Sequence, residues 1–165
     1  MFRKMKVFGL AIDPFTNSPI MILKDVNGEK SVPIWIGMLE ATAIASELEK
    51  INFSRPMTHD LLRNIIHQLG AEVIRVEVCD LKDNTFYALI HIHTQDKEFA
   101  IDARPSDAIA LALRTESPIF VAEEVIKRSK SVEMGHKEEI KTEEGKKWTE
   151  ILEKLSPEDF GKYKM

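Results

Sequence analysis

Cysteine is almost absent from this chain, in which Cys79 is the only one. A single cysteine cannot form an internal disulfide, so the fold must be held together by its apolar core. No run of eighteen apolar residues occurs, which excludes a membrane-spanning helix, and the first residues do not form the apolar stretch of a secretory signal peptide. We therefore expect a cytoplasmic protein that does not enter a membrane.

The chain also lacks an excess of positive charge. Its 165 residues include 23 Lys and Arg against 27 Asp and Glu, which gives a net charge of -4. Nucleic-acid affinity comes largely from neutralised phosphates, so this balance argues against a lysine-coated nucleic-acid binder but allows a local basic groove. Glutamine occurs only at Gln68 and Gln95, while charged residues make up 30% of the chain, a composition typical of thermophiles.

The hydrophobic pattern predicts two halves, each with three strands followed by helices. Strands are expected at 5–13, 20–23 and 32–36, then at 74–79, 86–93 and 99–102, with a further short strand at 118–121. Helices are expected at 40–50, 58–69 and 106–114, and a final helical turn or two at 123–128. Residues 1–130 are thus expected to form one domain.

The two halves share a short sequence pattern. Shifting the chain by 67 positions brings Glu40 onto Asp107, and in both places an acid precedes alternating alanines. We interpret this as an internal duplication with repeats at about 5–70 and 72–130, the alternative being chance similarity between two alanine-rich helices. Two merged halves predict an α+β fold, either one largely antiparallel sheet or a small barrel, with helices packed outside.

The tail, residues 131–165, has a different composition. Apolar residues are sparse as far as Lys147, which predicts a charged linker or a solvated helix. Trp148, Ile151, Leu152 and Leu155 then form a short apolar stripe. Such a short amphipathic helix should dock on this subunit or on a neighbouring one, and we expect a homo-oligomer, with a dimer favoured.

Ionisable groups gather where the last strand of the second half meets its helix. Proline after Arg104 keeps that residue extended, and we expect Ser106 to cap the helix, with Asp107 in its first turn. No residue from 108 to 113 is polar, so this helix should be buried on every face. Asp102 and Arg104 then lie at the start of a rigid buried element.

A second helix start repeats this chemistry. Arg55 precedes a proline, Thr58 is the expected cap, and His59 and Asp60 follow in the first turn. An arginine beside free helical amides can hold a phosphate, and a histidine can move a proton there. The structural alternative is that the hydroxyls are ordinary caps and the charges ordinary ion pairs.

Four blocks of residues in order, at 33–41, 55–62, 83–88 and 102–108, resemble the bifunctional nuclease family. The resemblance extends over roughly 5–128. It implies hydrolysis of both DNA and RNA, an activity attached to the family through its plant members. It thus predicts a nuclease of little sequence preference, with DNA or RNA as substrate.

Phosphodiester hydrolysis needs an activated water and a counter-charge for the phosphorane, from metal-bound carboxylates or from histidine with arginine. We favour the metal, Mg²⁺ or Mn²⁺, because a lone histidine is a limited acid-base system. The candidate site residues are Glu40, Arg55, His59, Asp60, Asp102, Arg104 and Asp107, of which Glu40, Asp60, Asp102 and Asp107 are the possible metal ligands.

Other functions remain open at this point. A non-catalytic interaction or regulatory domain could bind an anion or a protein partner with the same two helix starts. His91 and His93 lie two apart on a strand and could bind zinc, although their polar neighbours favour a solvated sheet surface. Cys79 falls on the same polar side of its strand and could be a reactive thiol.

Overall fold

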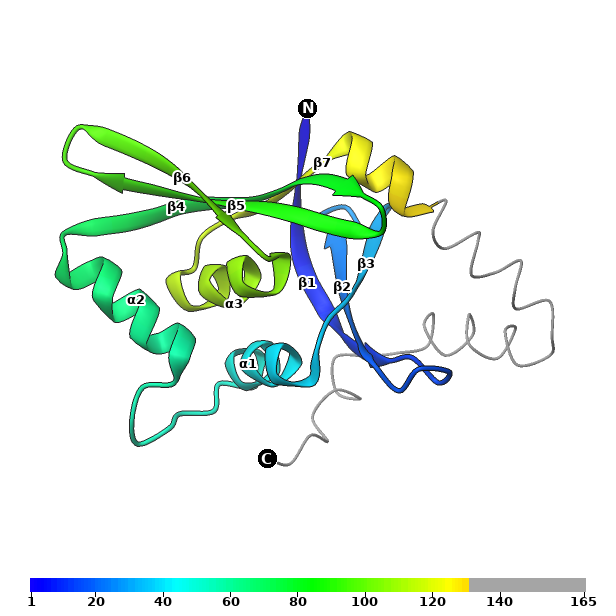
Figure 1. Ribbon diagram of the computed structural model, residues 1–165, viewed down its shortest axis with the longest axis horizontal. Helices are drawn as coiled ribbons and strands as arrows, with labels where there is room; N and C mark the ends of the chain where they lie inside the picture. Colours follow the sequence, from blue (N-terminus) through cyan, green and yellow to red (C-terminus); the bar gives the residue numbers. More distant parts are fainter. Residues whose placement is uncertain (131–165) are drawn as a thin grey trace.

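Within the part of the chain that the structure describes, seven strands rich in apolar residues form one sheet in the order β3-β2-β1-β7-β4-β5-β6 (Figure 1). A computed structural model describes residues 1–130. The elements are β1 (Phe2–Ile12), β2 (Pro19–Asp25), β3 (Ser31–Trp35), α1 (Met38–Leu48), α2 (Thr58–Gln68), β4 (Ala71–Lys82), β5 (Thr85–Thr94), β6 (Lys97–Ala103), α3 (Pro105–Thr115) and β7 (Ile119–Ala122). Residues 123–130 are helical, as the sequence predicted.

The sheet is open, with β3 and β6 at its two edges. Every neighbouring pair is antiparallel except β4 and β7, which run parallel. The predicted α+β class and the largely antiparallel sheet are therefore confirmed. The alternative of a small barrel is wrong, because the edge strands β3 and β6 do not pair with each other.

Each half forms a three-stranded antiparallel meander followed by helix. The strands β1, β2 and β3 precede α1 and α2, and β4, β5 and β6 precede α3. The last strand, β7, lies between β1 and β4 and joins the two meanders. This order agrees with the predicted halves, while the internal duplication itself stays a prediction.

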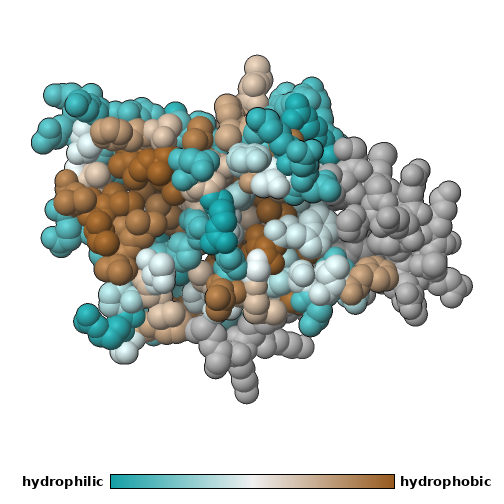
Figure 2. Space-filling view, in the orientation of Figure 1, coloured by the Kyte–Doolittle hydropathy of each residue, from teal (hydrophilic) through white to brown (hydrophobic). Residues whose placement is uncertain are grey.

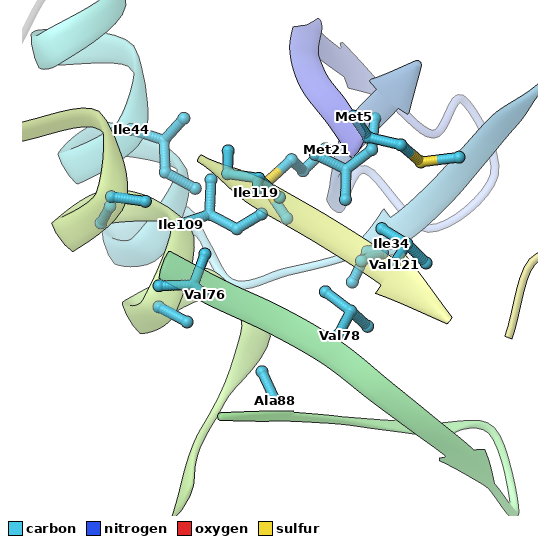
Figure 3. Packing of buried hydrophobic residues seen from close by; sticks show 14 of the residues in the cluster. Met5, Met21, Ile34, Ile44, Val76, Val78, Ala88, Ile109, Ile119 and Val121 are labelled. Carbon is cyan, nitrogen blue, oxygen red and sulfur yellow. The ribbon is translucent and has the colours of Figure 1, made fainter. Parts of the chain in front are cut away.

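Helix α3 forms the centre of the core. Residues 108–112 are buried on all sides, as their apolar composition predicted. Ile109 of α3 packs near Val76 of β4 and Ile44 of α1 (Figure 3). Burial of one such isoleucine side chain stabilises the fold by roughly 1.5–3 kcal/mol. The start of α3 is therefore held rigidly against the sheet.

The predicted helix caps are wrong at both helix starts. The residue that precedes α3 is Arg104, with Pro105 as the first helical residue, so Ser106 lies inside the first turn and is buried. Proline has no amide hydrogen that needs a partner, and its fixed φ suits the first helical position. The helix therefore begins at Pro105, one residue earlier than predicted. At α2 the preceding residue is Met57, and Thr58 is already helical.

No helix within residues 1–130 is long and apolar enough to cross a membrane. The predicted linker and amphipathic helix of residues 131–165 lie outside the described residues.

Candidate functional site

A groove of about 900 Å³ lies between helices α1, α2 and α3 and the strands β5 and β6. Its walls are largely apolar, and Figure 2 shows the corresponding hydrophobic area between the β4–β6 strands and α2. The aliphatic side chains that line it include Leu39, Leu62, Ile66, Ile90, Ile92, Ile101 and Leu111. Charged groups gather at one end, where α1, α2 and the start of α3 meet.

Arg104 joins two carboxylates at this charged end. Its Nη1 atom donates to Oε1 of Glu40 at 2.8 Å, and its Nε atom donates to Oδ2 of Asp107 at 3.0 Å. The arginine side chain is nevertheless 64% exposed. One guanidinium therefore pairs with two acids from different helices and still presents its outer surface to solvent.

His59 of α2 reaches the same carboxylate from the other side. Its Nε2 atom lies 2.9 Å from Oδ1 of Asp107, while Oδ2 of that residue accepts from Arg104. The histidine side chain is 14% exposed, so it lies at the groove wall and remains accessible. The three residues form a connected His-Asp-Arg chain, although they come from distant parts of the sequence.

The charge state of Asp107 follows from these contacts. Partial burial raises the pKa of the carboxyl, but hydrogen bonds from His59 and Arg104 outweigh burial, and its pKa lies below the usual value. For Glu40, a hydrogen bond from its own amide and one from Arg104 lower the pKa. Both acids are therefore ionised at neutral pH.

Gly37 makes room for the Glu40 carboxylate. Glycine precedes α1, and a Cβ atom built at this position would collide with the Glu40 carboxylate. Gly37 was not among the candidate site residues predicted from the sequence. The signal was available, because glycine directly before a helix with an acid three residues later is the spacing at which a side chain folds back over the helix start.

A second hollow, of about 360 Å³, lies on the other side of the Glu40–Arg104 pair. Trp35, Asn84 and Thr85 are among the residues that line it. The ion pair thus separates an apolar groove from a smaller, more polar hollow, and Arg104 lines both.

Asp60 lies behind this site, paired with an arginine that the sequence analysis missed. Arg114 of α3, whose side chain is only 2% exposed, donates to Oδ1 of Asp60 at 2.8 Å. It also donates to the carbonyl oxygens of Ala43 and Ala110 at 2.9 Å. This buried arginine therefore ties α1, α2 and α3 together. A lone charge at the end of an apolar helix was the sequence signal for it.

Two of the predicted site residues do not lie with the cluster of Glu40, His59, Arg104 and Asp107. Arg55 is exposed in the connection between α1 and α2 and does not line the groove. Asp102 lies at the groove edge, but it pairs with Leu89 in the register of β5 and β6. Alternation along β6 therefore directs its side chain to the face opposite Ile101, away from α3.

The candidate ligands do not form a metal site as they are placed. Glu40 and Asp107 share Arg104, Asp60 is bound by Arg114, and Asp102 faces away. Within residues 1–130, no three histidine, cysteine, aspartate or glutamate side chains are grouped so that they could hold a metal ion. A divalent cation would have to displace Arg104 from both carboxylates. The arrangement fits an arginine-bridged site, and Mg²⁺ or Mn²⁺ stays a prediction.

His91 does not lie on a solvated surface, contrary to the prediction. It is 8% exposed, and its Nε2 and Nδ1 atoms lie 3.0 Å and 3.2 Å from Glu77 and Glu98. Arg75 donates to both glutamates and covers the histidine. His93 is exposed, and within residues 1–130 neither histidine belongs to a group of three side chains that could hold a metal ion.

Cys79 lies on the same face of the sheet as His91. Burial raises the pKa of its thiol, and the nearby carboxylates of Asp80 and Glu77 raise it further. A raised pKa keeps the sulfur protonated, which argues against the reactive thiol considered above.

Comparison with known proteins relates this geometry to a family. Residues 21–134 match the bifunctional nuclease domain. An uncharacterised protein of Mycobacterium tuberculosis is 36% identical over 162 residues, which is 95% of this chain and 97% of that protein. Bifunctional nuclease 2 of Oryza sativa subsp. japonica is 26% identical over 109 residues, and bifunctional nuclease 1 of Arabidopsis thaliana is 25% identical over 107. Each plant match covers 62% of this chain and 33% of the relative.

Proposed function

This chain belongs to the bifunctional nuclease domain family, and on that basis we propose that it hydrolyses phosphodiester bonds in DNA and RNA with little sequence preference. The observation that best supports the proposal is the chain of contacts from His59 through Asp107 to Arg104, with an accessible histidine at one end and an exposed guanidinium at the other. These are the groups that hydrolysis of a phosphate ester uses.

In this proposal His59 activates the attacking water. Asp107 is ionised and can only accept a hydrogen bond, so the Nε2 atom of His59 carries the hydrogen that it donates. Nδ1 is then the basic nitrogen of the neutral ring and can take a proton from water. Asp107 holds the ring in this tautomer and stabilises the imidazolium that forms.

Arg104 supplies the counter-charge for the phosphorane. Its bonds to Glu40 and Asp107 use two of the five N–H groups of the guanidinium and fix the plane of the group. The remaining N–H groups can donate to phosphate oxygens, and a pre-positioned donor stabilises developing negative charge without reorganising. Arg55 is exposed four residues before His59 and is proposed to contact the nucleic-acid backbone outside the groove.

The alternative is a non-catalytic domain in which the same residues bind an anion or a protein partner. One observation favours it: Glu40 and Asp107 are both already paired with Arg104, as they would be in a structural clamp. Such a domain would bind single-stranded nucleic acid or phosphate without cleaving it.

A cleavage assay with matched histidine variants distinguishes the two functions. The full chain is incubated with single-stranded RNA and with plasmid DNA, in Mg²⁺, Mn²⁺ or EDTA, beside His59→Gln and His67→Gln. Both histidines lie on α2, but His67 is exposed in its last turn and does not line the groove. We expect His59→Gln to lower the rate by about 10²-fold or more, and His67→Gln to leave it unchanged.

Arg104→Lys adds a second comparison, because lysine keeps the charge but cannot bridge both carboxylates. Equal cleavage by wild type and His59→Gln would reject the site. An inactive wild type that is folded and still binds RNA would favour the binding domain.

A further inference from the structure

The edge strand β6 is exposed along nearly its whole length. Six of its seven residues are exposed, including Phe99 at 47% and Ile101 at 46%. Its pairing with β5 runs without a register shift, so the strand carries no bulge that would turn its free edge away. It also contains no proline. A strand edge with apolar side chains and with neither a bulge nor a proline is a template for another strand.

Helix α2 presents apolar residues on the same side of the molecule. Leu61, Leu62, Ile65 and Leu69 are among its exposed large side chains, with Leu69 at 76%. Leu62 and Ile101 line the same groove, which places α2 and β6 at its two borders. We call these six residues the β6/α2 surface: Leu61, Leu62, Ile65, Leu69, Phe99 and Ile101.

The extent of this surface matches a protein interface. The exposed fractions of its six apolar side chains correspond to an area on the order of 600 Å², against about 800 Å² buried per partner in a standard complex. The backbone and the polar rim of β6 would add the remainder. An apolar area of this size is at the upper end of what the surface of a monomer exposes, and patches of that size often mark a binding site.

We propose that the β6/α2 surface pairs two copies of this chain through antiparallel association of their β6 strands. An exposed strand can pair with its own copy across a two-fold axis, and a two-fold interface needs only one self-complementary surface. The two-fold axis is perpendicular to the sheet, and pairing of the two β6 strands joins the two seven-stranded sheets into one. Phe99 and Ile101 of both copies then lie on one face, beside the two α2 helices.

Charge on β6 argues against nucleic acid at this surface. The strand carries Glu98 and Asp102 on its outer face and only Lys97 as a cation. Phosphates would meet aliphatic groups on the β6/α2 surface and these two acids on the opposite face of the strand. The residues suited to phosphate, Arg104 and His59, lie at the charged end of the groove, beside the smaller hollow.

Pairing leaves that end accessible. The carboxyl end of β6 leads directly to Arg104, and antiparallel pairing brings the amino end of the other β6, with Lys97, alongside it. The two Arg104 sites therefore flank the two-fold axis, each with a lysine from the other copy close by. This inference does not depend on the proposed nuclease activity.

Sedimentation velocity of the full chain at 5–100 µM tests the proposal. At micromolar concentrations a stable dimer stays associated, whereas a weak encounter complex dissociates. We expect a dimer for wild type and a monomer for Ile101→Glu and Leu69→Glu, which add charge to β6 and α2 respectively. Phe15→Glu is the matched control, because Phe15 is equally exposed in the β1–β2 turn and should keep the dimer.

Hydrogen exchange supplies a readout that is independent of size. Amides of residues 97–103 should exchange slowly in wild type and quickly in Leu69→Glu, while residues 71–82 stay protected in both. A monomeric wild type, a dimer that survives both surface variants, or equal dissociation of Phe15→Glu would each overturn the proposal.

Discussion

The carboxylate of Glu40 occupies the space beside Gly37 that a Cβ atom would fill. In this position it accepts a hydrogen bond from its own amide and one from Arg104. The orientation of the exposed arginine therefore depends on a residue that has no side chain.

Gly37→Ala should disturb the site without unfolding the protein. The added methyl group displaces the Glu40 carboxylate, and Arg104 loses one of its two anchors. If the proposed function holds, we expect cleavage to fall by about tenfold, equivalent to ~1.4 kcal/mol, with little change in melting temperature. Glu40→Gln should give a similar loss. Full activity of Gly37→Ala would show that Glu40 does not position Arg104.

Asp60→Asn should be strongly destabilising, because it leaves the buried Arg114 guanidinium without its counter-charge. We expect the free energy of unfolding to fall by about 3 kcal/mol in urea denaturation. The control is Glu123→Gln, which removes a partly exposed partner of Arg3 and should cost less than about 1 kcal/mol. Similar costs for both variants would contradict the structural role given to Arg114.

The loss of folding stability at acidic pH should depend on Asp107. Its pKa in the folded state lies below the unfolded value of 3.8, so its contribution is fully present above that pH and is lost as the pH falls through the folded pKa. We expect Asp107→Asn to cost about 1 kcal/mol at pH 7 and progressively less below pH 4.

Urea denaturation of both proteins at pH 7, 5, 4 and 3 measures this difference. Asp96→Asn, in the exposed turn between β5 and β6, controls for the loss of one negative charge. A cost of Asp107→Asn that stayed constant over the whole range would contradict the assignment.

The placement of Arg104 also predicts how cleavage responds to metal removal. Because one guanidinium already bridges Glu40 and Asp107, we expect EDTA to leave the rate within about twofold of its value in Mg²⁺. Calorimetric titration with Mn²⁺ should likewise show no tight binding. A complete loss of cleavage in EDTA, restored by Mn²⁺, would support the metal ligands predicted from the sequence instead.

Much of the fold followed from short-range patterns. Alternation located the strands, and the absence of polar residues from 108 to 113 predicted the burial of α3. Glu40, His59 and Asp107 were all candidate site residues predicted from the sequence, and all three line one groove.

The placement of the remaining residues depends on the direction in which each side chain points and on contacts between distant parts of the sequence. Asp102 was placed in the site by its position in the chain, although its apolar neighbours Ile101 and Ala103 already indicated that it points the other way. The burial of His91 could not be predicted locally, because the covering side chains come from β4 and β6.

The position of β7 has a consequence for biosynthesis. Among residues 1–130 this strand is the last of seven, yet it is inserted between β1 and β4, antiparallel to the first and parallel to the second. Until Ala122 has left the ribosome, the two meanders have no shared hydrogen bonds in the sheet, and both β1 and β4 expose an unpaired edge to other nascent chains. Completion of the sheet is therefore a late, non-local event, which favours slow folding.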